Sequence, residues 1–245
     1  IVFGDWSSDV CSSDLLRIGQ TRSFGPNGEP SAIDKRTVDR TLWLGRTGFA
    51  DDQQGDPRHH GGTEKAVHHY PAEHYADWRR ELPATVHTTL QPGGFGENLS
   101  TGGLTESTVC IGDRWRLGEA LLEVSQPRKP CWKLNVRFGL ADMARRVQAS
   151  GRIGWYYRVL QPGPVEPDTP LELLERPHPD WPLARLLETL WDAQGDHKAL
   201  AEMASLTVLA PAWRDPARRR LVSGEIEAST ARLVTPTVGG DDPAG

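Results

Sequence analysis

Glycine and proline interrupt this chain so often that they constrain its fold more than any other feature. The 245 residues include 25 Gly and 19 Pro, well above the roughly 12% that these two residues usually contribute. Because Gly favours turns and Pro breaks helices and central strands, the chain should form many short elements joined by loops. We therefore expect a mainly β fold with some helices, built as a closed or partly closed β-barrel.

Period-two alternation and turn residues locate the expected strands. Gly118-Glu119 separates two alternating segments by two residues, which is typical of a β-hairpin. Two short helices interrupt the strands, one beginning at Pro71 and the other closed by Gly151, residues that suit a helix start and a helix end. The expected strands are 16–24, 38–44, 109–111, 114–117 and 120–124, and the expected helices are 71–82 and 140–151.

The hydrophobic period changes after the proline-rich stretch that ends at Pro182. Residues 183–191 carry leucines at helical spacing, and Asp180 is placed to cap this helix. The apolar stripe offers a surface for a homodimer or for packing on the chain's own barrel. Further helical segments near 200–203 and 213–221 complete a three-helix module over residues 171–232, followed by a disordered tail at 233–245.

The first fifteen residues do not resemble the start of a folded domain. They contain no basic residue and so lack the charged start of a signal peptide. The run Gly4–Leu15 looks like a translated sequencing adaptor. We interpret residues 1–15 as a non-native, adaptor-derived segment, in which Cys11 carries no chemistry.

Charge, hydropathy and cysteine content exclude several classes of protein. The 28 Lys+Arg against 33 Asp+Glu give a net charge of -5, which argues against a nucleic-acid-binding protein. No apolar run approaches the roughly 18 residues of a membrane span, so we expect no membrane association. Three cysteines are too few for a disulfide scaffold and suit a reducing compartment, so we expect a cytoplasmic protein.

Cys131 is the first candidate for chemistry, because cations crowd it. Arg128, Lys129 and Lys133 lie within three residues of it, and nearby cations favour the thiolate over the thiol. The local residues leave two interpretations open, a functional thiolate and an ordinary surface loop. Cys110 lies in an apolar context and is interpreted as structural.

A histidine-rich segment is the second candidate. Five of the eight histidines lie between residues 59 and 74, without an HExxH frame or a CxxC pair, which disfavours a zinc site. Gly61-Gly62 frees the backbone for close approach of an anion, which His60 and Lys65 would neutralise. A glycine turn with solvated histidines is the alternative.

A third candidate is the glycine-rich run Gly93–Glu106. Glu97 and Asn98 lie there between flexible turns and offer a carboxylate and an amide to a polar ligand, although a hairpin loop explains the run about as well. The chain has neither a G-x-S-x-G elbow nor a G-x-G-x-x-G motif after a strand, which disfavours a serine hydrolase and a dinucleotide-binding protein.

Taken in order, these segments resemble the YiiM group of MOSC-domain proteins, the 6-N-hydroxylaminopurine resistance family. The resemblance covers about residues 16–232 and includes the three-helix module. It implies a MOSC-type β-barrel over residues 16–165. The matching segments are Gly28–Ile33, His60–Gly62, His69–Pro71, Glu73–Tyr75, Phe95–Ser100, Gly103–Glu106, Ser125–Arg128, Pro130–Cys131, Lys133–Asn135 and Gly154–Trp155.

The resemblance implies a molybdenum cofactor of the molybdopterin type. Cys131 matches the family cysteine that ligates molybdenum, a role that suits a soft thiolate. The family is also described as binding pyridoxal phosphate, a property for which no residue of this chain is assigned. The positions implied to bind the pterin and its phosphate are His60, Gly61, Gly62, Lys65, His69, Asn98, Ser125, Arg128 and Asn135.

The implied reaction is the reduction of N-hydroxylated small molecules, such as hydroxylaminopurine-type base analogues, in a detoxifying role. The chain has no recognisable flavin, haem or iron–sulfur motif, so we expect an external electron donor, a flavoprotein reductase, as a partner. The alternative keeps the fold and drops the redox role. In it, Cys131 carries a persulfide and the protein is a sulfur carrier or a cofactor-handling module.

Overall fold

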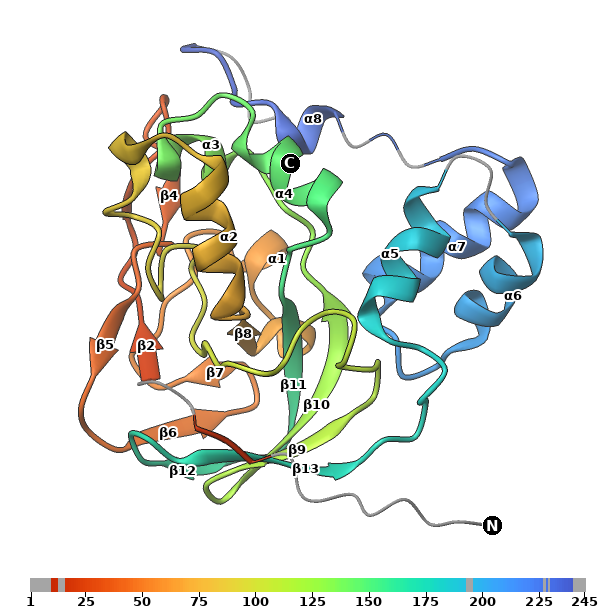
Figure 1. Ribbon diagram of the computed structural model, residues 1–245, viewed down its shortest axis with the longest axis horizontal. Coiled ribbons are helices and arrows are strands. Elements are labelled where there is room, and N and C mark those ends of the chain that lie inside the picture. Colours follow the sequence, from red (N-terminus) through yellow and green to blue (C-terminus); the bar gives the residue numbers. More distant parts are fainter. Residues whose placement is uncertain (1–9, 13–15, 193–195, 227, 229, 240–245) are drawn as a thin grey trace.

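The chain folds into a β-rich body and a separate helical module, as Figure 1 shows. The computed structural model describes residues 10–12, 16–192, 196–226, 228 and 230–239. Within these residues, no helix is both long enough and apolar enough to cross a membrane. The mainly β class with helices, expected from the sequence, is confirmed.

Six antiparallel strands form the main sheet of the body. The expected hairpin is present, since Leu117 pairs with Ala120 across Gly118, which has a positive φ of 60° that favours glycine. The sheet order is β1-β13-β9-β10-β11-β8. Its strands are β1 Val10–Ser12, β8 Val67–His69, β9 Arg114–Leu117, β10 Ala120–Pro127, β11 Trp155–Gln161 and β13 Pro170–Glu175.

Three smaller sheets complete the body. In the described part of the chain the strands form four sheets and not one continuous ring, so the architecture is the open form of the expected barrel. β12 Gly163–Val165, β6 Leu42–Gly45 and β7 Gly48–Phe49 form one sheet; β2 Leu16–Ile18 pairs with β5 Arg36–Val38, and β3 Arg22–Ser23 pairs with β4 Pro30–Ser31.

Three expected strands differ from the structure. The expected strand 16–24 is broken into β2 and β3, because the N–H of Gly19 donates to the Asp52 side chain and not to a neighbouring strand. The expected strand 38–44 is divided between β5 and β6, which belong to different sheets. The expected strand 109–111 is reduced to a single bridge between Cys110 and Pro182.

Both expected helices of the body are present. They are α2 Glu73–Glu81 and α4 Met143–Ser150, each slightly shorter than expected, and Gly151 ends α4 with a positive φ of 71°. Two further short helices, α1 Pro57–His60 and α3 Lys133–Phe138, were not expected from the sequence. Both lie beside candidate residues, since α1 ends at His60 and α3 begins two residues after Cys131.

The helical module consists of α5 Leu183–Trp191, α6 His197–Ser205 and α7 Pro211–Ser223. The leucine stripe of α5 is buried, as its spacing predicts. The expected cap at Asp180 is wrong, because Pro182 occupies the N-cap position and no side chain caps this helix. A fourth helix, α8 Thr230–Leu233, leaves the module and lies beside α3 and α4 on the body (Figure 1).

The ends of the chain bear on two further predictions. Val10–Ser12 is the edge strand β1, in which Cys11 lies opposite Leu171. Residues 1–9, 13–15 and 240–245 lie outside the described residues. The adaptor origin of residues 1–15 and the domain limits 16–165 and 171–232 remain predictions. Of the tail predicted to be disordered at 233–245, residues 233–239 are described and make contacts with the body, and disorder beyond them remains a prediction.

Candidate functional site

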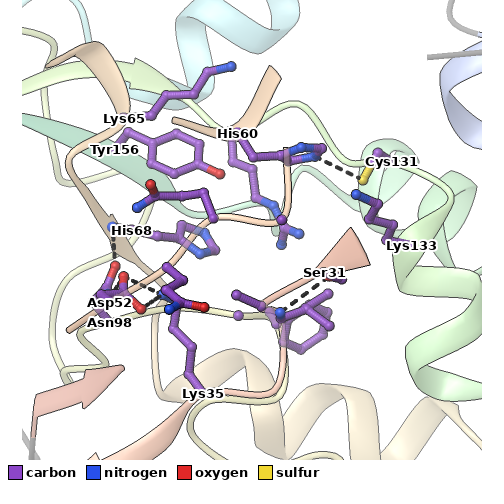
Figure 2. Close-up of a pocket in the computed structure, with 18 of the residues that line it drawn as sticks. Ser31, Lys35, Asp52, His60, Lys65, His68, Asn98, Cys131, Lys133 and Tyr156 are labelled. Atoms are coloured by element: carbon purple, nitrogen blue, oxygen red, sulfur yellow. Dashed lines mark hydrogen bonds and ion pairs between the residues drawn. The ribbon is translucent and has the colours of Figure 1, made fainter. Parts of the chain in front are cut away.

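A cavity in the β-rich body collects most of the candidate residues. Its empty space is about 600 Å³, which includes the open mouth. Its walls come from β4, α1, β8 and the loops that carry Asn98 and Cys131 (Figure 2). The predicted site residues that line it are His60, Lys65, Asn98, Arg128 and Cys131.

Cys131 lies at one end of the cavity and contacts a histidine. Its side chain is buried, and its Sγ lies 3.6 Å from Nε2 of His60 (Figure 2). Burial, together with the charges of Lys133, Lys65 and Arg128, lowers the pKa of His60 to about 3, so its imidazole is neutral near pH 7. A neutral imidazole either accepts a hydrogen bond from the S–H of the thiol or donates a hydrogen bond from Nε2–H to the thiolate.

The cavity is strongly cationic. Lys35, Lys65, Arg128 and Lys133 all line it. Among the described residues of the lining, Asp52 supplies the one carboxylate, and it is paired with Lys35. Burial lowers the pKa of Lys35, while the carboxylate of Asp52 opposes this shift. Such a surplus of positive charge suits a ligand that carries negative charge.

Three buried polar atoms around this cavity have no hydrogen-bond partner within the described part of the chain. They are Nδ1 of His60, Nε2 of His68 and Nη1 of Arg128. Buried polar atoms without partners are rare and costly. All three residues line the cavity, so a polar ligand with donor and acceptor groups would compensate for their burial. A phosphorylated pterin carries both kinds of group and fits this set, with the soft sulfur of Cys131 available to molybdenum.

Asn98 belongs to the network that supports the cavity wall. Its Nδ2 donates to Asp52 at 2.8 Å and to the backbone carbonyl of Arg17 at 2.9 Å, while its Oδ1 accepts from the N–H of His68 at 3.0 Å. Asn98 therefore fixes the position of the Lys35–Asp52 ion pair relative to β8. Its polar atoms are used mainly within the protein.

Three predicted site residues lie away from the cavity. Both ring nitrogens of His69 are bonded, to Tyr157 at 3.0 Å and to Thr101 at 2.9 Å. Ser125 donates to the carbonyl of Glu64, and Asn135 accepts from the N–H of Ala144. The structure does not bring these three side chains to the cavity, and the contacts they make hold the fold together.

The two glycines differ in what surrounds them, and neither is part of the cavity lining. Gly62 has a positive φ of 93°, and a Cβ built there would meet nothing within 4 Å. Gly61 packs on α1, where a Cβ would lie 3.0 Å from the Pro57 carbonyl. The expected close approach of an anion to this backbone remains a prediction.

Sequence reasoning missed several residues of the lining. Four of them, Lys35, Asp52, His68 and Tyr156, reach the cavity from separate segments. Burial raises the pKa of Tyr156, which keeps its hydroxyl protonated and able to donate. His68 adjoins His69 on β8, and neighbouring strand residues point to opposite faces. Strand alternation therefore predicts that only one of the two histidines faces the cavity. It does not say which one.

The alternative of a zinc site is not supported. Among the residues that the structure describes, no three His, Cys, Asp or Glu side chains come together as a metal site. The histidine-rich segment is dispersed: His74 pairs with Glu106 at 2.7 Å, and His69 lies on the far side of β8 from the cavity.

Comparison with known proteins agrees with this architecture. The MOSC domain model matches residues 56–172, and the model for the YiiM-like, 3-alpha helix domain matches residues 181–224. Protein YiiM of Escherichia coli (strain K12) is 43% identical over 208 residues, which are 85% of this chain and 92% of that protein. The crystal structure of YiiM from Escherichia coli has a TM-score of 0.75 and 37% identity, covering 89% of this chain and 99% of that chain.

A longer relative carries a name that describes an activity. A protein named "Reductase" from Gibberella moniliformis (strain M3125 / FGSC 7600) is 38% identical over 210 residues, which are 85% of this chain and 37% of that protein. The MOSC domain is associated with molybdenum cofactor binding. The two domain matches, the identity to YiiM over most of both chains and the shared fold lead to one conclusion: this chain belongs to the YiiM family of MOSC-domain proteins.

Proposed function

We propose that this protein is a molybdenum-cofactor-dependent reductase of N-hydroxylated small molecules, with the Cys131 thiolate as the protein ligand of the metal. The observation that carries the proposal is a buried thiol at the end of a cation-lined cavity that contains unpartnered polar atoms. The fungal relative named "Reductase" supports the reaction class.

The residues of the cavity divide into two roles. Arg128 has an unpartnered Nη1 donor for the anionic groups of a pterin, and His68 has an unpartnered Nε2 for its polar groups. Lys65 adds positive charge at the same wall. His60, which contacts Sγ, orients Cys131, and its neutral imidazole would donate Nε2–H to the sulfur when that sulfur acts as an anion toward the metal.

The proposed reaction converts R–NHOH to R–NH₂ and water, and it consumes two electrons and two protons. When bound, molybdenum supplies the oxygen-accepting redox chemistry. The hydroxyl of Tyr156, kept protonated by burial, is a hydrogen-bond donor for a polar substrate in the cavity. The electrons come from an external donor, for which we propose a flavoprotein reductase.

A persulfide carrier is the competing function, and the polar lining of the cavity argues against it. A single additional sulfur atom on Cys131 has no use for the unpartnered polar atoms of His68 and Arg128. Metal content separates the two functions directly.

The decisive experiment compares wild type with Cys131→Ser, both produced in a host that synthesises the molybdenum cofactor. We expect about one molybdenum and one pterin per wild-type chain, and reduction of a hydroxylaminopurine with a chemically reduced flavoprotein as donor. The Ser variant should lose the metal and the activity while its circular dichroism stays that of wild type. A Ser variant with full metal and full activity would contradict the ligand role, and a metal-free active wild type would contradict the proposal as a whole.

A further inference from the structure

The segment after the helical module returns to the candidate site. Residues 230–239, here called the C-terminal strap, begin with α8 and lie beside α3 and α4 (Figure 1). The strap contacts the two residues that flank Cys131. The backbone carbonyl of Arg232 accepts from the N–H of Trp132 at 2.8 Å. The guanidinium of the same Arg232 donates to the carbonyl of Pro130.

These two contacts restrain the conformation of Cys131 itself. The peptide plane before Cys131 contains the Pro130 carbonyl, and the plane after it contains the Trp132 N–H. Peptide planes are rigid, so the φ and ψ of Cys131 are the two soft torsions between them. Because Arg232 holds both planes, it restrains both torsions and thereby the direction in which the Cys131 side chain leaves the backbone.

The strap is itself anchored at several points. Leu233 is buried, and its carbonyl accepts from Nδ2 of Asn135 at 3.0 Å. Farther along, the carbonyl of Thr237 accepts from Nδ2 of Asn27 at 3.1 Å, and Gly239 donates to Oδ1 of Asn27 at 2.7 Å. The strap therefore connects the Cys131 loop to the turn between β3 and β4, close to a second wall of the cavity.

We infer that Arg232 is a positioning residue for Cys131, and that the C-terminal strap keeps the sulfur directed into the cavity. The inference assigns Arg232 no contact with cofactor or substrate. The inference rests on the proposed function only in saying why Cys131 needs a fixed direction. The restraint itself is a property of the protein without cofactor. Its test therefore uses thiol chemistry on that form.

The test measures alkylation of Cys131 by iodoacetamide in cofactor-free protein, followed by peptide mass spectrometry. Cys110, also buried, is the internal reference in the same sample, because general loosening of the fold would accelerate both cysteines. Arg232→Ala removes the donor to Pro130 and leaves the backbone acceptor for Trp132 in place. We expect the ratio of Cys131 to Cys110 alkylation rates to rise about fivefold, as loss of one backbone-anchoring hydrogen bond should increase local opening.

Two matched variants isolate the contact. Gln148→Ala removes a second partner of the Arg232 guanidinium, which lies at 2.8 Å, and should leave the alkylation ratio at the wild-type value. Arg232→Lys retains one donor and should give an intermediate ratio. If Arg232→Ala does not fold, the alkylation ratios of Arg232→Lys and Gln148→Ala are compared instead. Only Arg232→Lys should give a ratio above that of wild type.

One result would overturn the inference: a Cys131-to-Cys110 ratio in the Arg232 variants equal to that of wild type, whether neither cysteine or both react faster. A second readout is molybdenum retention after gel filtration of loaded protein, which should weaken by about tenfold in Arg232→Ala, as for other supports of metal ligands. If wild type binds no molybdenum, the proposed function fails, but the alkylation ratio still tests the role of Arg232.

Discussion

Replacing His69 by Gln should make the stability of the protein less dependent on pH. Burial lowers the pKa of His69 from its ordinary value of about 6.5 to about 3, while both ring nitrogens are bonded to neutral hydroxyls. A histidine with a depressed pKa in the folded state stays neutral there while it gains a proton in the unfolded chain. Its contribution is therefore fully present above pH 6.5 and is lost as the pH falls toward 3.

The size of this effect follows from the two pKa values. Between pH 7 and pH 5 the unfolded histidine becomes almost fully protonated and the folded one does not, which costs about 2 kcal/mol of unfolding free energy. The Gln side chain keeps a donor and an acceptor for Tyr157 and Thr101 but does not titrate. The variant should thus lose about 2 kcal/mol less than wild type over this interval, whatever its absolute stability.

Urea denaturation followed by tryptophan fluorescence at pH 7, 6 and 5 measures the difference. His197→Gln is the matched control for replacing a histidine, because that side chain is exposed on α6. Parallel stability curves for wild type and His69→Gln would show that His69 is not a buried neutral group and would refute the reasoning.

Two other predictions concern charges of the cavity. Lys35→Met removes one partner of the buried pair with Asp52 and should lower the unfolding free energy by about 3 kcal/mol in urea titrations, whereas an unchanged midpoint would mean that the pair is solvated. Arg128→Met should weaken binding of inorganic pyrophosphate about tenfold by calorimetry at low salt, because it removes a buried cationic donor. Arg40→Met, at an exposed arginine, is the control, and equal affinities for both variants would argue against an anion site at Arg128.

Local sequence signals predicted the local parts of the fold. The two-residue hairpin at Gly118 and the helix ended by Gly151 depend on neighbouring residues, and both form as expected. Pairings between distant segments, such as β8 with β11, leave no local signal. Helix α3 was missed because it follows two prolines so closely that the sequence around Cys131 is typical of a loop.

The sequence predicted those parts of the candidate site that lie in segments resembling the YiiM group. The motifs placed Cys131, Arg128 and Asn98 at or beside one cavity. The pair of Lys35 and Asp52 could not be predicted, because chain folding alone brings these residues together. His69 was wrongly assigned to the site for a simpler reason. Two adjacent strand residues face opposite sides of the strand, and only the contacts of His69 with Thr101 and Tyr157 show that it faces away from the cavity.

The return of α8 also sets an order of events during protein synthesis. Arg232 lies 102 positions after the Pro130 that it contacts, so a ribosome translating 5–20 residues per second makes it roughly 5–20 s after that residue. Until then, the loop around Cys131 lacks its anchor, even if the β-rich body has already collapsed. Under the proposed function, a cofactor would meet a firmly held sulfur only after Arg232 has been translated.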